Sequence, residues 1–290
     1  MTGEQAHERV ADDSLRAALR GMWATAAAGW SEHAAYVDAR GAGITRAMLD
    51  GATPGRGDRV LELACGPGGV GLAAAARVGP GGSVVLSDAV AAMTAIAAER
   101  AAGLGLTNVT TVEVDLEHID QPDATYDAVL CREGLMLTPD PGRALREIRR
   151  VLLPGGRAAV AVWGQRARNP WLGVLFDAVT AHTGAPVPPP GIPGPFSLGD
   201  AGTLAGLLTG AQLTDVVVSE VSVPLRATSF DEWFTTVPAL AGPIAAVLAS
   251  LPDDAIAAIR AHAERALAPY AGRDGYDIPG VSLVAAGRRG

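Results

Sequence analysis

The stretch that decides the fold is Val60-Leu61-Glu62-Leu63-Ala64-Cys65-Gly66-Pro67-Gly68-Gly69-Val70-Gly71. Its first four residues form a short, mostly apolar run of the kind that becomes a buried parallel strand. The turn that follows is rich in glycine, and the alanine-rich segment after it strongly favours a helix. A strand, a glycine turn and a helix bring the backbone close to a ligand beside the positive N-terminus of the helix.

Three acidic residues make this stretch more specific. The glycine spacing G-x-G-x-x-G, which begins at Gly66, also matches the dinucleotide fingerprint and is a weak signal alone. However, Glu62 lies inside the first strand, Asp88 follows a second apolar run, and Asp115 closes a third. Asp88 can accept hydrogen bonds from both hydroxyls of a ribose. Acids at three strand ends suit a cationic nucleoside better than a pyrophosphate.

The composition excludes several classes of function. The chain has 290 residues, a formal net charge of −8 and no lysine. The negative charge and the lack of a basic run argue against nucleic acid as a partner. Without lysine, Schiff-base chemistry, a pyridoxal-phosphate anchor and a P-loop are excluded.

The cysteines and the apolar segments bear on the compartment. Only two cysteines occur, Cys65 and Cys131, which suits a reducing cytoplasm. The longest apolar stretch, 239–251, is interrupted by Pro243 and is too short to span a bilayer. We therefore expect a cytoplasmic protein without a membrane partner.

The order of segments predicts an α/β fold. Helices near 15–23 and 31–40 precede alternating strands and helices, and a second helical region occupies 228–270. The predicted strands are 60–64, 83–87, 109–114, 126–131, 157–163, 214–223 and 280–287. Such alternation implies a doubly wound, mostly parallel sheet with helices on both faces. The predicted organisation is an N-terminal helical arm (1–50), a sheet domain (51–225), a helical cap insertion (226–278) and a final strand (279–290).

These motifs resemble the class I S-adenosylmethionine (SAM)-dependent methyltransferases, nearest to the small-molecule branch that includes the quinone-biosynthesis C-methyltransferases. The similarity covers roughly residues 55–165. Ala64 and Cys65 stand where the family more often has glycine and a variable residue. The matching pieces are 61–68, Asp88 with Met93, Asp115-Leu116, 126–131 and 150–156.

The resemblance implies a seven-stranded Rossmann-like sheet and SAM as the cofactor. Gly66 and Gly68 would leave room for the methionine part, Glu62 would help hold its amino group, and Asp88 would take the ribose. From the residues alone, Asp88 also fits a helix N-cap and Asp115 a turn residue. The full set of implied cofactor-binding residues is Glu62, Gly66, Gly68, Asp88, Ala89, Met93, Asp115, Leu116, Cys131 and Tyr36.

The catalytic group is less clear from the sequence. A general base would assist transfer to a phenol, an alcohol or an acidic carbon. The candidates are Glu133, His118 and His33, with His182 and His262 nearer the cap, and each also fits an ordinary surface or packing residue. Arg132 and Glu133 follow the fourth strand at the ligand-binding edge, although they also fit a structural pair. No metal-ligand spacing occurs, so no metal is predicted.

The aromatic residues suggest where the acceptor binds. Of the thirteen aromatic residues, only Tyr126 lies between residues 55 and 160. We therefore expect a small apolar or aromatic acceptor, methylated on oxygen or carbon, between the sheet edge and the cap. The same side chains also suit helices that simply cover a sheet. The candidate substrate-binding residues are Arg132, Trp163, Trp171, Phe196 and Trp233.

Two other functions remain open from the sequence. A protein of the same fold could bind the nucleoside without transferring a methyl group, or act only in regulation. A nicotinamide-dependent oxidoreductase fits the glycines, but Glu62, Asp115 and the missing Tyr-x-x-x-Lys pair stand against it. A homodimer is possible, and no nucleic-acid partner is expected.

Overall fold

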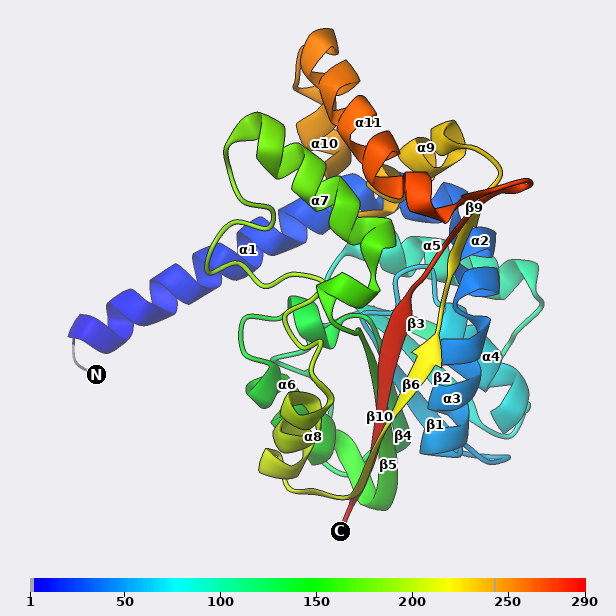
Figure 1. Cartoon of the computed structure of the whole chain (residues 1–290). Helices are drawn as coiled ribbons and strands as arrows, with labels where there is room; N and C mark the ends of the chain where they lie inside the picture. Colours follow the sequence, from blue (N-terminus) through cyan, green and yellow to red (C-terminus); the bar gives the residue numbers. More distant parts are fainter. Residues whose placement is uncertain (1–2, 243) are drawn as a thin grey trace.

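The computed structural model describes residues 3–242 and 244–290 and is built around a seven-stranded sheet (Figure 1). The strand order is β3-β2-β1-β4-β5-β10-β6. Strands β1 to β5 are parallel to their neighbours, whereas β10 is antiparallel to both β5 and β6. The predicted doubly wound, mostly parallel sheet is confirmed. The bounds are β1 (Arg59–Leu63), β2 (Ser83–Asp88), β3 (Val109–Glu113), β4 (Tyr126–Arg132), β5 (Leu152–Trp163), β6 (Leu213–Ser222) and β10 (Val281–Arg289).

Helices cover both faces of this sheet. In Figure 1, α3 (Ala42–Ala52) and α4 (Gly69–Val78) lie on one face, and α6 (Pro141–Val151) and α8 (Ala201–Gly210) lie on the other. Helix α6 shows why these segments are helical. The carboxylate of Asp140 accepts a hydrogen bond from Arg143 N, and Pro141 occupies the first turn, where no N–H is needed. Its buried side chains, spaced by three to four residues, face the sheet: Ala144, Leu145, Ile148 and Val151.

The N-terminal region is more continuous than the sequence predicted. A single helix, α1 (Gly3–Glu32), precedes α2 (Ala34–Arg40), where separate helices near 15–23 and 31–40 were expected. Gly29 lies inside α1 and does not break the helix, because a larger residue would not fit at this position. A β-carbon there would lie 2.6 Å from the carbonyl oxygen of Ala239 in α9 (Phe230–Leu240). Close helix packing therefore outweighs the low helix propensity of glycine.

Strand β5 begins five residues before the predicted strand at 157–163. Pro154-Gly155-Gly156, a combination that usually interrupts regular structure, lies inside this strand. Pairing with β4 passes from Tyr126–Leu152 to Ala128–Arg157, so the extra residues form an irregularity. Gly155 has φ 84°, which allows the backbone to turn there without steric cost.

A group of helices lies over one end of the sheet. In Figure 1, α7 (Pro170–Thr183), α9, α10 (Ile244–Ala249) and α11 (Asp253–Leu267) gather at the end where β10 begins. Because β10 is antiparallel to β5, this is the carboxyl end of the parallel strands. The predicted helical content of 228–270 is confirmed. The sequence missed a small sheet, because its strands are only two to four residues long: β7 (Leu225–Ala227), β8 (Ala271–Gly272) and β9 (Gly275–Ile278).

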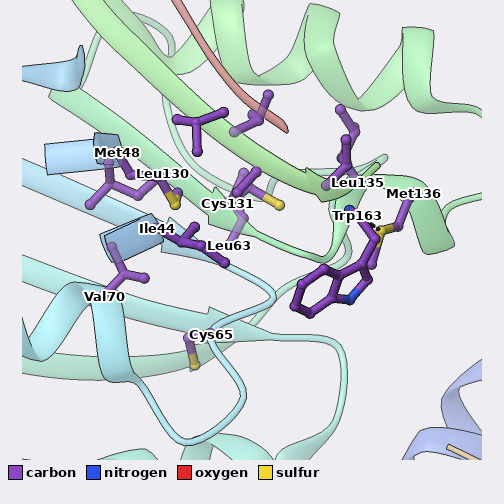
Figure 2. Packing of buried hydrophobic residues seen from close by; sticks show 14 of the residues in the cluster. Ile44, Met48, Leu63, Cys65, Val70, Leu130, Cys131, Leu135, Met136 and Trp163 are labelled. Carbon is purple, nitrogen blue, oxygen red and sulfur yellow. Dashed lines mark hydrogen bonds between the residues drawn. The ribbon is translucent and has the colours of Figure 1, made fainter. Parts of the chain in front are cut away.

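The buried core continues to the carboxyl end of the sheet. Figure 2 shows side chains of α3, β1 and β4 packed together, with the Trp163 ring at the edge of the cluster. Trp163 N–H donates to the sulfur of Met136, which lies in the 3₁₀ turn Leu135–Leu137. The end of β5 is therefore held rigidly. The helix α5 (Ala91–Gly103) completes the layers beside β2 and β3.

None of the helices in the described ranges is both long enough and apolar enough to cross a membrane.

Candidate active site at the carboxyl end of the sheet

The glycine turn after β1 is held in place by Glu62. This side chain is 1% exposed, and its Oε2 accepts a hydrogen bond of 2.8 Å from Gly71 N. Burial raises the pKa of Glu62 to about 7, although Arg132 and the Gly71 N–H partly offset this effect. The carboxyl group therefore fastens the first turn of α4. Its contact with the amino group of a ligand stays a prediction.

Asp88 joins the glycine turn to the next helix. Its Oδ2 accepts from Gly66 N at 2.9 Å, and its Oδ1 accepts from Val90 N at 3.0 Å. Burial raises the pKa of Asp88, while these two N–H groups favour the ionised form. The N-cap of α5 is Val90, so Asp88 is not the N-cap residue. Each carboxylate oxygen keeps a further lone pair for a ligand.

Helix α1 lies across this part of the site. Trp23, Ala27 and Trp30 pack with Val90 and Met93, and Met93 is only 4% exposed. A β-carbon at Gly66 would lie 3.8 Å from the Trp30 ring. The glycine-turn half of the site is the name we give to Glu62, Gly66, Gly68, Asp88, Met93 and Trp30.

Asp115 and its neighbours border the glycine-turn half. Asp115 Oδ1 accepts from Glu117 N at 2.9 Å, as a turn residue does, and Oδ2 lies 3.6 Å from Arg20 of α1. Leu116 is buried, and Ala89 is half-buried beside Asp88. The interpretation of Asp115 as a turn residue is therefore correct, and the arm also reaches it.

Glu133 begins the other half of the site, directly after β4. Its φ is 61°, in the left-handed region that side chains such as glutamate rarely adopt. A 2.8 Å hydrogen bond from Glu133 N to Ala161 O holds this conformation. Burial raises the pKa of the carboxyl group, partly offset by Arg132 and Arg40.

Arg40, at the end of α2, lies against two tryptophans. The centre of its guanidinium group is 3.9 Å from the ring centroid of Trp171 and 5.1 Å from that of Trp163. Such contacts are typical of cation–π interactions. Its Nη2 donates to Val223 O at 3.3 Å. Burial lowers the pKa of Arg40, with Tyr36 and Glu133 acting in the opposite direction. We call Arg40, Glu133, Trp163 and Trp171 the tryptophan half.

Two further residues fix the orientation of Trp171. Its Nε1 donates to Asn169 Oδ1 at 3.0 Å, and Asn169 is fully buried. Trp233, which is 0% exposed, donates from Nε1 to the carbonyl oxygen of Trp171 at 3.0 Å. Trp233 therefore helps to fix the position of Trp171. We call the paired rings of Trp163 and Trp171 the tryptophan wall. The sequence analysis missed Asn169, since an asparagine before a proline is an ordinary start of a helix.

Asp38 joins α2 to α5 and to the end of β4, and the sequence analysis missed it as well. This α2 side chain forms ion pairs with Arg100 and, at 3.7 Å, with Arg132. A β-carbon at Gly69 would overlap Asp38 Oδ1, so the glycine allows α2 to approach the turn. Arg132 also donates to Thr45 at 3.1 Å, which turns it toward the arm. No local pattern signals pairs so distant in the sequence.

The remaining candidates lie in different environments. Tyr36 is half-buried beside Arg40, in the tryptophan half, and burial raises its pKa. Cys131 is 0% exposed, and burial raises its pKa to about 12. Phe196 packs against Phe176, with ring centroids 6.2 Å apart. His118 is exposed and helps to lower the pKa of Glu147, while His33 lies between α1 and α2.

Unpaired polar atoms mark both halves. Among the side chains of residues 14–242 and 244–290, three buried atoms have no hydrogen-bond partner: Trp30 Nε1, Arg40 Nε and Glu133 Oε1. An unpaired buried polar group costs about 1–3 kcal/mol. All three belong to the candidate site defined above, where a ligand could supply the missing partners.

Comparison with known proteins agrees with this geometry. Residues 60–156, from β1 to the irregularity in β5, match the Methyltransf_25 family, described as a methyltransferase domain. Over these residues, about a third of the chain, the sequence is therefore similar to a methyltransferase domain. The chain is 35% identical, over 128 residues, to the ubiquinone/menaquinone biosynthesis C-methyltransferase UbiE of Cronobacter sakazakii. That match covers 44% of this chain and 51% of the relative, so the chain spans about half the length of the curated relatives it matches.

Solved structures share the fold of this chain well beyond residues 60–156. The YcgJ protein of Bacillus subtilis has a TM-score of 0.58 at 19% identity, covering 84% of this chain and 97% of that one. The [4+2]-cyclase SpnF has a TM-score of 0.52 at 24% identity, covering 84% and 79%. At these identities the likeness concerns the fold alone.

Proposed function

We propose that this protein is a SAM-dependent methyltransferase that acts on oxygen or carbon of a small, apolar or aromatic acceptor. The observation that carries the proposal is the glycine turn tied to Asp88, inside a domain of methyltransferase type. The 35% identity to a quinone-biosynthesis C-methyltransferase supports a small-molecule acceptor. The net charge of −8 gives no support to nucleic acid as acceptor, and two free cysteines suit a cytoplasmic location.

The residues of the glycine-turn half fit the adenosyl cofactor. At Gly66 the space that a side chain would fill is bounded by the Trp30 ring. Trp30 Nε1 is a buried donor with no partner among the described residues, and Asp88 has lone pairs to spare. Asp88 would hold the ribose hydroxyls, and Met93 with Trp30 would enclose the adenine.

The chemistry then depends on alignment of the acceptor. When bound, SAM supplies a methyl carbon whose bond to a sulfonium breaks while the electron pair stays on sulfur. The chain has to hold the acceptor atom in line with that carbon, which can supply about 7–11 kcal/mol of the barrier reduction. The Trp163 and Trp171 wall, fixed by Asn169 and Trp233, is a rigid surface for this purpose. Helices α1 and α9 would exclude water.

The test is calorimetric titration of the full chain with SAM, S-adenosylhomocysteine (SAH) and NAD. We expect binding of both adenosyl ligands, no binding of NAD, and loss of binding in Gly66→Val, whose side chain fills the turn. Asp88→Asn is the milder companion, because an amide oxygen still accepts from one N–H. Binding of NAD without binding of SAM or SAH would overturn the proposal.

A second function is favoured by one comparison. A [4+2]-cyclase shares the fold over 84% of the chain, so the fold also occurs in a protein that is not described as a methyltransferase. Incubation with SAM carrying a labelled methyl group and an extract of small metabolites separates the two. Label in an organic product supports methyl transfer, whereas adenosyl binding with no labelled product supports the second function.

A further inference from the structure

We propose that the tryptophan half takes an acceptor with an acidic hydroxyl on an aromatic or enolic system, with Glu133 receiving its proton and Arg40 holding the resulting oxyanion. The inference rests on the proposed function and specifies its acceptor. It is carried by the two unpaired polar atoms of this half, one an acceptor and one a donor.

The first step concerns the relation between the two charged groups. Glu133 and Arg40 influence each other electrostatically, yet within the described chain no ion pair of 4.0 Å or less joins them. Buried opposite charges that remain apart lose most of the energy that a direct pair would return. A ligand hydroxyl between them would donate to Glu133 Oε1 and accept from Arg40 Nε, which satisfies both atoms.

The second step concerns backbone strain. Glu133 lies at φ 61°, and such conformations cost roughly 1–3 kcal/mol unless the surroundings impose them. The hydrogen bond from Glu133 N to Ala161 O imposes this one. Gly134 follows, and a β-carbon there would overlap Ala64, so the turn is tightly packed beneath the carboxylate. The backbone conformation of this turn therefore fixes the direction in which the Glu133 side chain leaves the chain.

The third step is the kind of ligand. Trp163 and Trp171 meet edge to face with ring centroids 4.9 Å apart, and Arg40 covers both. Aromatic edges and a flat guanidinium group suit a planar ligand. The charged groups around Glu133 are Arg132 and Arg40. Farther out, Tyr36 raises the pKa of Arg40, and Glu232 raises the pKa of Tyr36. The two arginines stabilise an anion after the proton has moved.

The atoms balance as follows. The hydroxyl proton of the acceptor moves to Glu133 Oε1, and the negative charge spreads over the oxygen and the conjugated carbons. The new bond forms between that oxygen, or one such carbon, and the methyl carbon, while the carbon–sulfur bond breaks and its electron pair remains on sulfur. Glu133 then releases the proton to water. If carbon is the nucleophile, the carbon also loses its own proton to water.

The test uses 4-nitrophenol as probe and nitrobenzene as its matched analogue without the hydroxyl, with the full chain saturated with SAH. Absorbance reports the phenolate form of bound 4-nitrophenol. Near the pKa of the free probe, we expect a larger phenolate fraction on the protein than in solution. We also expect nitrobenzene to bind roughly 10- to 100-fold more weakly.

Variants make the assignment specific. Glu133→Gln and Arg40→Gln should each abolish the gain in phenolate, while SAH binding stays near that of the wild type. Arg40→Gln also loses its contacts with Trp163, Trp171 and Val223 O and should melt at a lower temperature. The control is Glu99→Gln, an exposed position on α5, which should change neither. Equal binding of the two probes, no binding of 4-nitrophenol, or an unchanged phenolate fraction in Glu133→Gln would each overturn the inference. Failure of SAH to bind the wild type would instead overturn the proposed function.

Discussion

The charged side chains of the two halves of the site are hydrogen-bonded in different ways, although the glycine-turn half also contains one buried donor, Trp30 Nε1, without a partner among the described residues. In the glycine-turn half, Glu62 and Asp88 are fastened to backbone N–H groups of the turn and of the next helix. In the tryptophan half, Arg40 Nε and Glu133 Oε1 are buried without partners in the described structure. The first half is preorganised around a fixed backbone, and the second retains donors and acceptors for a ligand. The comparison suggests that one half is a general cradle and the other sets specificity.

The largest expected effect comes from removing the support of the tryptophan half. Trp233→Ala deletes a side chain that is 0% exposed and removes the hydrogen bond from its Nε1 to Trp171 O. We expect a loss of about 3–5 kcal/mol in the free energy of unfolding, measured by urea denaturation. Phe234→Ala, at a half-buried neighbouring position, is the control and should cost clearly less. Equal losses would show that the wall has no special support.

The next effect tests the buried acid of the glycine-turn half. The pKa of Glu62 is about 7, against an ordinary value of 4.5. Between those values the folded protein holds a proton that the unfolded chain has released. The free energy of unfolding should therefore fall as pH rises through this window, by about 1.4 kcal/mol per pH unit, and Glu62 should add no change above it.

Glu62→Gln isolates this contribution, because the amide oxygen can still accept from Gly71 N. We expect the variant to lose the decline between pH ~4.5 and ~7 and to be more stable than the wild type at pH 8. The measurement is urea denaturation at several pH values. The same pH dependence in both proteins would contradict the assignment of a raised pKa to Glu62.

A smaller effect concerns the packing of the glycine turn. In Gly71→Ala the new methyl group would overlap Leu86 and lie 2.6 Å from Glu62 Oε2. We expect a loss of about 1–3 kcal/mol in stability and weaker SAH binding, measured by calorimetry. Gly103→Ala is the matched control, because nothing lies within 4 Å of its β-carbon position. If both variants bind SAH like the wild type, the cradle is less rigid than this geometry implies.

The smallest effect concerns the arm. Arg20 and Asp115 lie 3.6 Å apart, and the Arg20 side chain is 43% exposed. Because exposed ion pairs are weak, Arg20→Ala should cost at most about 1 kcal/mol of stability. Thermal unfolding measures this loss. A larger one would mean that the arm is held mainly by charge rather than by Trp23, Trp30 and Met93.

The sequence predicted one half of the site better than the other. Strand ends in a parallel sheet meet at one edge, so local signals at Gly66, Asp88 and Asp115 were enough to predict that these residues lie at that edge. Arg40, Asp38 and Asn169 gave no such signal. Their roles depend on contacts with residues far away in the sequence, such as the hydrogen bond from Arg40 to the carbonyl oxygen of Val223, 183 residues away.

Distant contacts also decide which candidate for the general base is best placed. Glu133 was placed beside Arg132 as a structural pair or a base, and no sequence pattern separates these alternatives. The structure turns Arg132 toward Asp38 and Thr45 and leaves Glu133 Oε1 without a partner in the described residues. The catalytic role of Glu133 stays a prediction, while His118 and His33 lie in less suitable surroundings.

The most direct measurement of the central claim is a crystal structure of the full chain with SAH. The account predicts that the ribose hydroxyls lie within hydrogen-bond distance of Asp88, beside Gly66 and Trp30, and that the sulfur faces the tryptophan half, which stays open for the acceptor. A ribose bound at Arg40 and Glu133, or an adenosyl group elsewhere on the sheet, would contradict the division of the site into a cradle and an acceptor half.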